Sequence, residues 1–357
     1  MTETTPNHTQ TVEGWAAMDS SGKIAPFVFK RRENGEDDVT IKILYCGICH
    51  TDLHQARNDW GITKYPVVPG HEITGVITKV GSNATNFKVG DRVGVGFLAA
   101  SCLECEFCKA SEENYCDDVQ FTYNGFFWDG SITYGGFSKM LVADKRYVVH
   151  VPDSLPLDAA ASLLCAGITV FSPMKHYMCQ PGKKLGVVGL GGLGHVAVKF
   201  GKAFGLHVTA ISTTPSKEKD AKERLGADDF IVSTDIERMK SGARSLDCII
   251  DTVPVKHALG PILNLLTVRG TLVLVGVPDK PVDLPSFPLI FGKRNVAGSM
   301  VGGMKETQEM MDFCGKHNIT CDIELVKPDQ INEALDRIAR NDVRYRFVID
   351  IDASSDH

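Results

Sequence analysis

One short run of glycines constrains this chain more than any other feature. Gly189-Leu190-Gly191-Gly192-Leu193-Gly194 has the spacing G-x-G-x-x-G. The apolar run KLGVVG at 184–189 leads into it and predicts a buried strand, and a helix is predicted at 195–204. Glycines in such a turn let the backbone approach a pyrophosphate, whose charge the helix N-terminus stabilises. Because strand, turn and helix occur in this order, the motif predicts a dinucleotide site rather than an ordinary glycine-rich loop.

The chain after residue 165 alternates between predicted strands and predicted helices. Beyond the glycine turn, apolar runs predict strands at 207–212, 228–233, 246–252 and 271–277. A charged helix is expected at 217–226. Strands that alternate with helices are typical of βαβ units, so this part is expected to form a parallel, doubly wound sheet.

The chain before residue 165 has a different pattern. Short β-rich runs, without helices between them, occur at 39–47, 73–81 and 91–97. Such runs predict an antiparallel, barrel-like domain. Near the end, helices are expected at 305–317 and 330–341, and a last strand at 344–351 could return to the first domain. The expected fold class is therefore α/β, with one β-rich domain and one doubly wound domain.

The end of the strand at 207–212 indicates which dinucleotide binds. NAD sites place a carboxylate there, which accepts hydrogen bonds from the ribose 2′-hydroxyl. This chain has Ser212, Thr213 and Lys217 in that region and no carboxylate between them. Hydroxyls and a cation suit a 2′-phosphate, so NADP(H) is the favoured cofactor. A polar loop with a solvated lysine is the alternative.

Four of the eleven cysteines follow the spacing Cys102-x2-Cys105-x2-Cys108-x7-Cys116. Four closely spaced thiolates can surround one ion tetrahedrally, and such a closed set is typical of structural zinc. An iron–sulfur cluster and unligated thiols are the alternatives. Three other cysteines lie in plain surroundings and are expected to be small core or surface residues: Cys179, Cys248 and Cys314.

Four more candidate ligands are scattered along the chain. Cys49 lies in GICHTDLH at 47–54, His71 and Glu72 lie in VPGHE, and Cys165 lies in LLCAG. Taken singly, each could be structural, since His71 could cap a turn and Cys165 could be a buried small residue. Together they supply two thiolates and an imidazole, the ligand set of a catalytic zinc with an open fourth position. Because Cys165 directly precedes the doubly wound part, such a metal would lie near a nicotinamide.

Charge and composition argue against several classes of partner. Lys and Arg total 38 against 44 Asp and Glu, a net charge of −6, which argues against nucleic acid or an anionic membrane as the main partner. No apolar run approaches the ~18 residues of a membrane span. The N-terminal sequence lacks the pattern of a signal peptide, and an odd number of cysteines fits a reducing compartment. A cytoplasmic location is therefore expected.

Several long motifs carry a resemblance to a known family. They are GICHTDLH, YPVVPGHE, the four-cysteine segment, LLCAGIT, GLGGLGHVAVKF and DVRYRFVID. From about residue 12 to 351, the chain resembles zinc-dependent medium-chain alcohol dehydrogenases, and more closely the plant cinnamyl alcohol dehydrogenase group. The resemblance implies a GroES-like catalytic zinc domain at 1–165 and 306–357, and a Rossmann nucleotide-binding domain at 166–305.

The resemblance also implies roles for the scattered residues. Cys49, His71 and Cys165 would bind a catalytic zinc, and Glu72 would lie beside it, able to replace the water ligand. Three neighbours in the same motif would complete the machinery: Thr51 as the hydroxyl that touches the substrate oxygen, His54 as the end of a proton relay, and Asp52 as a carboxylate that holds a ligand histidine. A surface histidine and a turn-forming aspartate are the alternatives for His54 and Asp52.

By the same resemblance, two further sets line the cofactor and substrate sites. The cofactor set is Thr169, Gly189, Leu190, Gly191, Gly192, Leu193, Gly194, Ser212, Thr213, Lys217, Thr252, Val275, Val277, Ser299 and Arg346. The substrate set is Gln55, Trp60, Ile62, Phe97, Phe121, Val277, Ile290, Phe291, Met300 and Val301. The aromatic members would form an apolar slot suited to a flat conjugated aldehyde, although large apolar residues are also ordinary core material.

The resulting expectation is an NADP(H)-dependent alcohol dehydrogenase with two zinc ions per chain. It would interconvert allylic or aromatic primary alcohols and aldehydes of the cinnamyl or geraniol type. An NADPH-dependent reductase of iminium ions or conjugated C=C bonds is one alternative, and a non-enzymatic zinc-binding protein is another. The resemblance further implies a homodimer in which the nucleotide domains pair edge to edge, with NVAGSMVGG at 295–303 as the contributing stretch.

Overall fold

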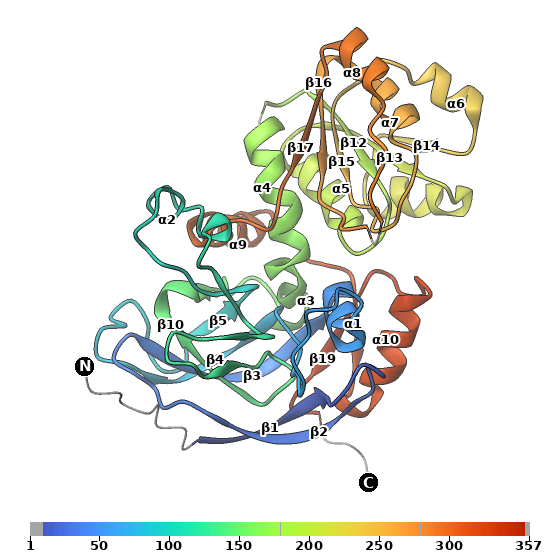
Figure 1. Ribbon diagram of the computed structural model, residues 1–357. Coiled ribbons are helices and arrows are strands. Elements are labelled where there is room, and N and C mark those ends of the chain that lie inside the picture. The colour runs from blue at the N-terminus through green and yellow to red at the C-terminus, as the bar shows by residue number, and fades with distance from the viewer. Residues whose placement is uncertain (1–9, 179, 279, 354–357) are drawn as a thin grey trace. The chain divides into compact units, whose positions relative to one another are not determined.

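The computed structural model describes residues 10–178, 180–278 and 280–353. The chain divides into two compact units (Figure 1): residues 1–165 with 302–357, and residues 166–301. The chain returns to the first unit at Gly302, slightly earlier than the expected 306. Cys179 lies outside the described residues.

The first unit is built around a seven-stranded sheet. Its central strand, β3 (Asp38–Ile48), pairs antiparallel with β4 (Ile73–Val80), β10 (Met140–Asp144) and β19 (Arg346–Asp350). The remaining strands are β5 (Arg92–Val95), β11 (Val149–His150) and β18 (Ile323–Val326), of which β18 pairs parallel with β19. The predicted return of the last strand is confirmed, because Phe347 of β19 faces Ile48 of β3 in register.

Smaller elements surround this sheet. Three two-stranded antiparallel sheets are formed by β1 (Gln10–Ala17) with β2 (Ile24–Arg31), β6 (Leu98–Ala100) with β7 (Gln120–Phe121), and β8 (Gly125–Phe126) with β9 (Ile132–Thr133). The helices are α1 (His50–Arg57), α2 (Glu106–Lys109), α3 (Leu157–Ala161), α9 (Met304–His317) and α10 (Ile331–Ala339). Short 3-10 turns lie at Glu113–Tyr115, Lys145–Tyr147, Ser162–Leu164 and Pro328–Gln330. The two helices predicted near the C-terminus are confirmed as α9 and α10.

Large apolar side chains of the central strands form the core of the first unit. Ile41 and Ile43 of β3, Ile73 and Ile77 of β4, and Phe347 of β19 are each 1% exposed or less. Burial of such a side chain contributes about 1.5–3 kcal/mol, so the contacts between these strands are strongly stabilised. The ends of β3 and β4 are thereby held close together, and this is where the metal-site residues begin.

The second unit contains the predicted parallel sheet, in the order β14-β13-β12-β15-β16-β17. The strands are β12 (Lys184–Val188), β13 (His207–Ser212), β14 (Asp229–Val232), β15 (Leu246–Asp251), β16 (Leu266–Leu274) and β17 (Asn295–Gly298). The helices are α4 (Ala166–Met178), α5 (Gly194–Ala203), α6 (Ile236–Ser241), α7 (Leu259–Leu265) and α8 (Ser286–Gly292). The central strands are buried along almost their whole length, as expected when helices cover both faces of a sheet.

The glycine turn joins β12 to α5, and two of its positions require glycine. Gly189 has φ +87°, a conformation that other residues rarely adopt. A Cβ on Gly194 would lie 1.9 Å from the Gly189 carbonyl oxygen. The first turn of α5 can therefore pack directly against the end of β12, which leaves its N-terminus open toward a ligand.

The charged segment at 217–226 differs from the expected single helix. The chain forms a 3-10 turn at Pro215–Lys217 and then a π-helical turn at Asp220–Arg224. Gly226, at φ +83°, ends the segment, and the Leu225 N–H donates to the Asp220 carbonyl. The pattern of charges does not distinguish these windings, because turns of three to five residues are too short to show a period.

In the described parts of the chain, no single helix has both the length and the apolarity of a membrane span. One bent pair of helices, Leu157–Leu164 and Ala166–Tyr177, meets the length and composition criterion only when both members are counted together.

Candidate functional site

Three segments of the first unit converge on one cluster of ligand groups. Cys49 follows β3 and precedes α1, His71 and Glu72 directly precede β4, and Cys165 follows the 3-10 turn at Ser162–Leu164. Since β3 and β4 are antiparallel neighbours with Cys46 opposite Ile73, the end of one strand meets the start of the other. One ligand atom from each of the four residues lies within 4.8 Å of all the others.

The separations fit a tetrahedral metal. Cys49 Sγ lies 4.0 Å from Cys165 Sγ, and His71 Nε2 lies 3.2 Å from Cys165 Sγ. Zinc–sulfur bonds of ~2.3 Å in a tetrahedron require sulfurs about 3.8 Å apart. The hydrogen bond from Cys165 lowers the pKa of the Cys49 thiol well below its usual value. The donor set and its spacing therefore suit zinc.

Asp52 connects two of the ligand-bearing segments. Its carboxylate is fully buried and accepts the Cys49 N–H at 2.8 Å and the Gly70 N–H at 3.0 Å. Its Oδ1 also lies 3.3 Å from His71 Nδ1. This contact turns the other ring nitrogen, Nε2, toward the cysteines, as carboxylates commonly do for ligand histidines.

Glu72, a member of the cluster, forms a buried ion pair with Arg346. Glu72 is fully buried and Arg346 is 4% exposed, and an Arg346 Nη2 donates to Glu72 Oε1. Burial raises the pKa of Glu72 to about 7, although the charge of Arg346 opposes this shift. The other carboxylate oxygen, Oε2, has no hydrogen-bond partner among the described residues. Arg346, expected in the cofactor set, is thus placed against a candidate metal ligand.

Thr51 and His54 lie on α1, beside Cys49. Thr51 Oγ1 is 3.7 Å from Cys49 Sγ. His54 is partly exposed, and its Nδ1 lies 2.8 Å from Asp59 Oδ2. A carboxylate accepts hydrogen bonds, so Nδ1 carries the proton and Nε2 is left to exchange one. Asp59 was not anticipated from the sequence, because no motif includes it.

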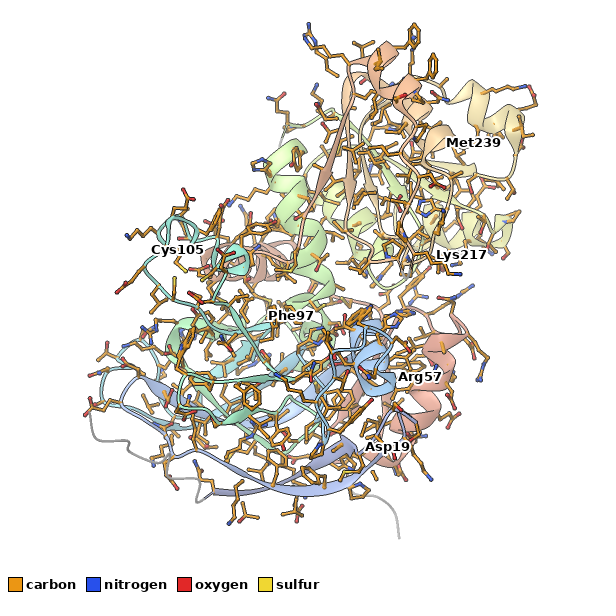
Figure 2. The ribbon with its side chains drawn as sticks, viewed as in Figure 1. Asp19, Arg57, Phe97, Cys105, Lys217 and Met239 are labelled. Carbon is orange, nitrogen blue, oxygen red and sulfur yellow. The ribbon has the colours of Figure 1, made fainter. Side chains whose placement is uncertain are left out.

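The second cluster is the four-cysteine lobe, which carries α2 and on which Cys105 is labelled (Figure 2). Cys102 Sγ lies 3.9 Å from Cys108 Sγ and 3.5 Å from Cys116 Sγ. The backbone N–H groups of Cys105 and Cys108 point at sulfurs three residues earlier, both at 3.4 Å. Donors aimed at sulfur stabilise thiolates, so the lobe fits a closed zinc site.

Two hydroxyls outside the cysteine motif form a chain of polar contacts that ends at one of its sulfurs. Ser101 Oγ lies 3.1 Å from Cys108 Sγ, and the buried Tyr147 hydroxyl donates to Ser101 Oγ at 2.7 Å. Tyr147 is remote from the cysteines in sequence, so the motif gave no signal for it.

Two of the expected cofactor residues of the second unit, Thr252 and Lys217, contact the glycine turn. Thr252 Oγ1 donates to the Val188 carbonyl at 2.8 Å, and Lys217 Nζ donates to the Leu190 carbonyl at 2.8 Å. Others lie at the carboxyl ends of the strands or on α4: Thr169, Ser212, Thr213, Val275, Val277 and Ser299. His195 was not anticipated from the sequence, although its fully buried ring lies 3.1 Å from the Gly191 carbonyl and supports the turn.

The expected substrate residues are divided between the two units. In the first unit, the Phe97 ring meets His71 edge-on at 5.4 Å and Phe121 at 4.4 Å. Trp60 and Ile62 follow α1 and are 37% and 61% exposed. Gln55, on α1, accepts hydrogen bonds from Thr63 and Asn124. In the second unit Val301 is buried and Met300 is 38% exposed, whereas the other members are largely exposed: Val277, Ile290 and Phe291.

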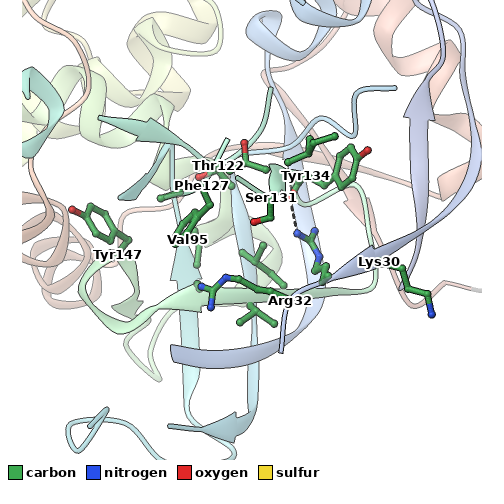
Figure 3. Close-up of a pocket in the computed structure, with 15 residues that line it drawn as sticks. Lys30, Arg32, Val95, Thr122, Phe127, Ser131, Tyr134 and Tyr147 are labelled. Atoms are coloured by element: carbon green, nitrogen blue, oxygen red, sulfur yellow. Dashed lines mark hydrogen bonds between the residues drawn. The ribbon is translucent and has the colours of Figure 1, made fainter. Parts of the chain in front are cut away.

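A separate pocket of the first unit is lined mainly by β-strand residues (Figure 3). Its lining includes Arg31, Arg32 and Phe127, and does not include the metal-site cysteines. Arg31 is 8% exposed and donates to the Tyr134 and Gly135 carbonyls at 2.8 and 3.0 Å. Burial lowers the pKa of this guanidinium to about 9. Arg31 therefore connects the N-terminal hairpin to the rest of the unit.

The two units define a class of protein. A parallel sheet with a glycine turn, and a separate cluster of two thiols, an imidazole and a carboxylate, are the parts of a metal-dependent dinucleotide dehydrogenase. Residues 35–153 match the family model described as alcohol dehydrogenase GroES-like domain, and residues 192–316 match that of zinc-binding dehydrogenase.

Curated relatives narrow this class. "Probable cinnamyl alcohol dehydrogenase 6" of Oryza sativa subsp. japonica is 74% identical over 357 residues, with 99% of both chains covered. A "probable mannitol dehydrogenase" of Medicago sativa is 61% identical, with 95% of this chain and 94% of the relative covered. "8-hydroxygeraniol dehydrogenase" of Catharanthus roseus is 57% identical, with the same coverage.

Solved structures agree with these relatives. A cinnamyl alcohol dehydrogenase of Sorghum bicolor matches with a TM-score of 0.95 and 54% identity, over 98% of this chain and 99% of that one. The corresponding enzyme of Helicobacter pylori, complexed with NADP(H), matches with a TM-score of 0.91 and 40% identity, over 97% and 99%. This chain belongs to the cinnamyl alcohol dehydrogenase group of the zinc-binding alcohol dehydrogenases. The expected GroES-like and Rossmann fold class is confirmed.

Proposed function

We propose that this protein interconverts allylic or aromatic primary alcohols and their aldehydes, with NADP(H) as the hydride carrier. The observation that carries the proposal is the cluster of Cys49, His71 and Cys165 beside the Phe97 ring. A metal-ligand set next to an aromatic surface suits a carbonyl group attached to a flat, conjugated tail.

The residues of the site take separate parts in this reaction. Zinc held by Cys49, His71 and Cys165 would supply a Lewis acid at the substrate oxygen, and NADP(H) would supply or accept the hydride. Thr51 Oγ1, 3.7 Å from Cys49 Sγ, forms a hydrogen bond with that oxygen and relays a proton between the oxygen and His54. His54, whose Nδ1 is held by Asp59, gives or takes this proton at Nε2. Phe97 and Phe121 contact the apolar tail and exclude water from it.

The choice of NADP(H) rests on the end of β13. Ser212, Thr213 and Lys217 offer hydroxyls and a cation, and no carboxylate lies among them to repel a 2′-phosphate. The Helicobacter pylori relative, complexed with NADP(H), supports the same choice.

The assembly proposed for this protein is a homodimer formed through the second units. β17 lies at one edge of the six-stranded sheet and pairs with β16 on one side only. The nearby helix α8 leaves Phe287, Ile290 and Phe291 each at least 73% exposed. An open edge next to exposed aromatic side chains favours pairing with a second copy. A cytoplasmic location is proposed as well, because a cluster of closely spaced cysteines that suits a metal is typical of a reducing compartment.

A substitution in the cluster tests the proposed function. Cys165→Ser should remove one zinc per chain and lower kcat/KM for cinnamaldehyde reduction by ~10³-fold, about 4 kcal/mol of transition-state stabilisation. Cys248→Ser, which alters a buried thiol of β15 in the other unit, should retain both zinc ions and activity. A parent protein that is fully active with one zinc or none would contradict the assignment.

A further inference from the structure

His257 lies in the segment that follows β15, and both of its ring nitrogens face acceptors. Nε2 lies 2.7 Å from Asp251 Oδ2, and Nδ1 lies 2.8 Å from the Val255 carbonyl oxygen. The Asp251 side chain is 1% exposed, and the His257 side chain is 22% exposed. Neither residue belongs to the motifs that indicate the cofactor or metal sites.

This geometry determines the protonation state of the ring. A backbone carbonyl can only accept, so Nδ1 must carry a hydrogen. An ionised carboxylate also only accepts, so Nε2 must carry one as well. The ring is therefore an imidazolium that forms an ion pair with Asp251. Consistently, the hydrogen bond to Asp251 raises the pKa of His257 above its ordinary value.

The ion pair lies within the framework of the glycine turn. Asp251 is the last residue of β15, and its backbone carbonyl accepts the Val275 N–H at 3.0 Å and the Gly276 N–H at 3.1 Å. Its neighbour Thr252 donates through Oγ1 to the carbonyls of Val188 and Gly189. Dinucleotides bind at the carboxyl ends of the strands in sheets of this type, so the 251–258 segment borders the place where the cofactor would lie.

Few charges compete with this pair in the described part of the chain. Asp251 Oδ1 accepts the Val253 N–H at 3.1 Å, which leaves Oδ2 for His257. The adjacent Lys256 pairs with Asp283 at 2.9 Å. Asp251 is the charged group that acts on the ring.

We propose that His257 is a positioning residue for the dinucleotide: as an imidazolium paired with Asp251, it holds the 252–258 segment in the conformation that binds NADPH. This inference rests on the proposed use of NADP(H). When the ring loses a proton, it keeps only one of its two donors, and the buried Asp251 loses its counter-charge. The negative phosphates of NADPH favour the same protonated state. Binding should therefore weaken as pH rises through the pKa of His257, and bound NADPH should in turn raise that pKa.

Titration of NADPH binding tests the proposal. Fluorescence should give a Kd for NADPH that rises about tenfold between pH 6 and pH 10 in the parent. His257→Gln, which keeps one donor but no titrating charge, should bind about tenfold more weakly at pH 6 and show little of this pH dependence. His207→Gln, at the amino end of β13, is the matched control and should follow the parent.

Parallel curves for the parent and H257Q would overturn the inference while leaving the proposed function intact. Failure of the parent to bind NADPH at any pH would overturn the proposed function and this inference together. If H257Q does not fold, ¹⁵N NMR of the histidine rings in the parent measures the pKa of His257 with and without NADPH. A pKa of His257 that rises on addition of NADPH supports the proposal, and an unchanged pKa overturns it.

Discussion

At the scale of single residues, Asp52 shows how one buried carboxylate can organise a metal site. It accepts N–H groups from the segments that carry Cys49 and His71, and it faces His71 Nδ1. Asp52→Asn keeps the size of the side chain but removes its charge and turns one acceptor into a donor. Zinc at the catalytic cluster should then bind ~10–100-fold more weakly.

Zinc transfer to a chromophoric chelator measures this effect. Asp59→Asn is the matched control, since the Asp59 carboxylate contacts His54. It should leave zinc affinity unchanged and slow the reaction instead, because His54 would lose the carboxylate that holds its ring. Equal zinc release from the Asp52→Asn variant and the parent would show that Asp52 does not hold the ligands.

Ser212 determines the cofactor through charge. Ser212→Asp places a carboxylate at the end of β13, where it would repel the 2′-phosphate and accept hydrogen bonds from a free ribose. We expect kcat/KM for NADPH to fall about tenfold or more, ~1.4 kcal/mol, and the preference over NADH to narrow. Ser241→Asp adds the same charge on α6 and should leave kcat/KM unchanged for both NADPH and NADH. Equal kcat/KM for the two cofactors in the parent would contradict the charge argument.

At the scale of elements, the four-cysteine lobe supports a helix far from it in sequence. Glu113 Oε2 accepts the Met304 N–H at 3.0 Å, at the first turn of α9. A Cβ on Gly303 would lie 1.9 Å from the Ser111 carbonyl oxygen, so the lobe and the start of α9 are in direct contact. Loss of order in the lobe should therefore expose the N-terminus of α9.

Cys105→Ser tests this coupling. The variant should lose one zinc per chain, because metal binding supplies folding free energy to the lobe. Amide hydrogen exchange should accelerate in the lobe and in the first turn of α9, but not in α10. Glu106→Gln, on the exposed α2, is the control and should exchange like the parent. Retention of both zinc ions by Cys105→Ser would contradict a structural metal in the lobe.

The sequence predicted the individual elements better than the contacts between elements that are distant in the chain. The order of strand, glycine turn and helix predicted the sheet of the second unit, because those signals are local. The Glu72–Arg346 pair joins residues 274 positions apart, and Tyr147 reaches Ser101 across 46 positions. Such contacts depend on how β19 and the Lys145–Tyr147 turn pack, so no local pattern indicated them. Asp251 and His257 are close in sequence, but their pairing depends on the path of the segment between them.

At the scale of the whole molecule, the open sheet edge and the exposed aromatic residues of α8 predict association. Light scattering should give a mass about twice the 38.9 kDa of one chain at micromolar concentration. Ile290→Glu, at a side chain that is 74% exposed, should shift the protein toward the monomer. Ile236→Glu alters an apolar residue on α6 that is 68% exposed, and this variant should remain dimeric. A parent mass near that of one chain would contradict the dimer.

In the proposed reaction, hydride reaches a carbonyl carbon rather than a conjugated double bond. The most direct test is reduction of cinnamaldehyde with NADPH deuterated at C4 of the nicotinamide, followed by NMR of the product. The expected product is cinnamyl alcohol with deuterium on the carbinol carbon and the C=C bond intact, formed ~10³-fold more slowly by the Cys165→Ser variant. Deuterium at C3 of a saturated aldehyde would contradict the proposed reaction.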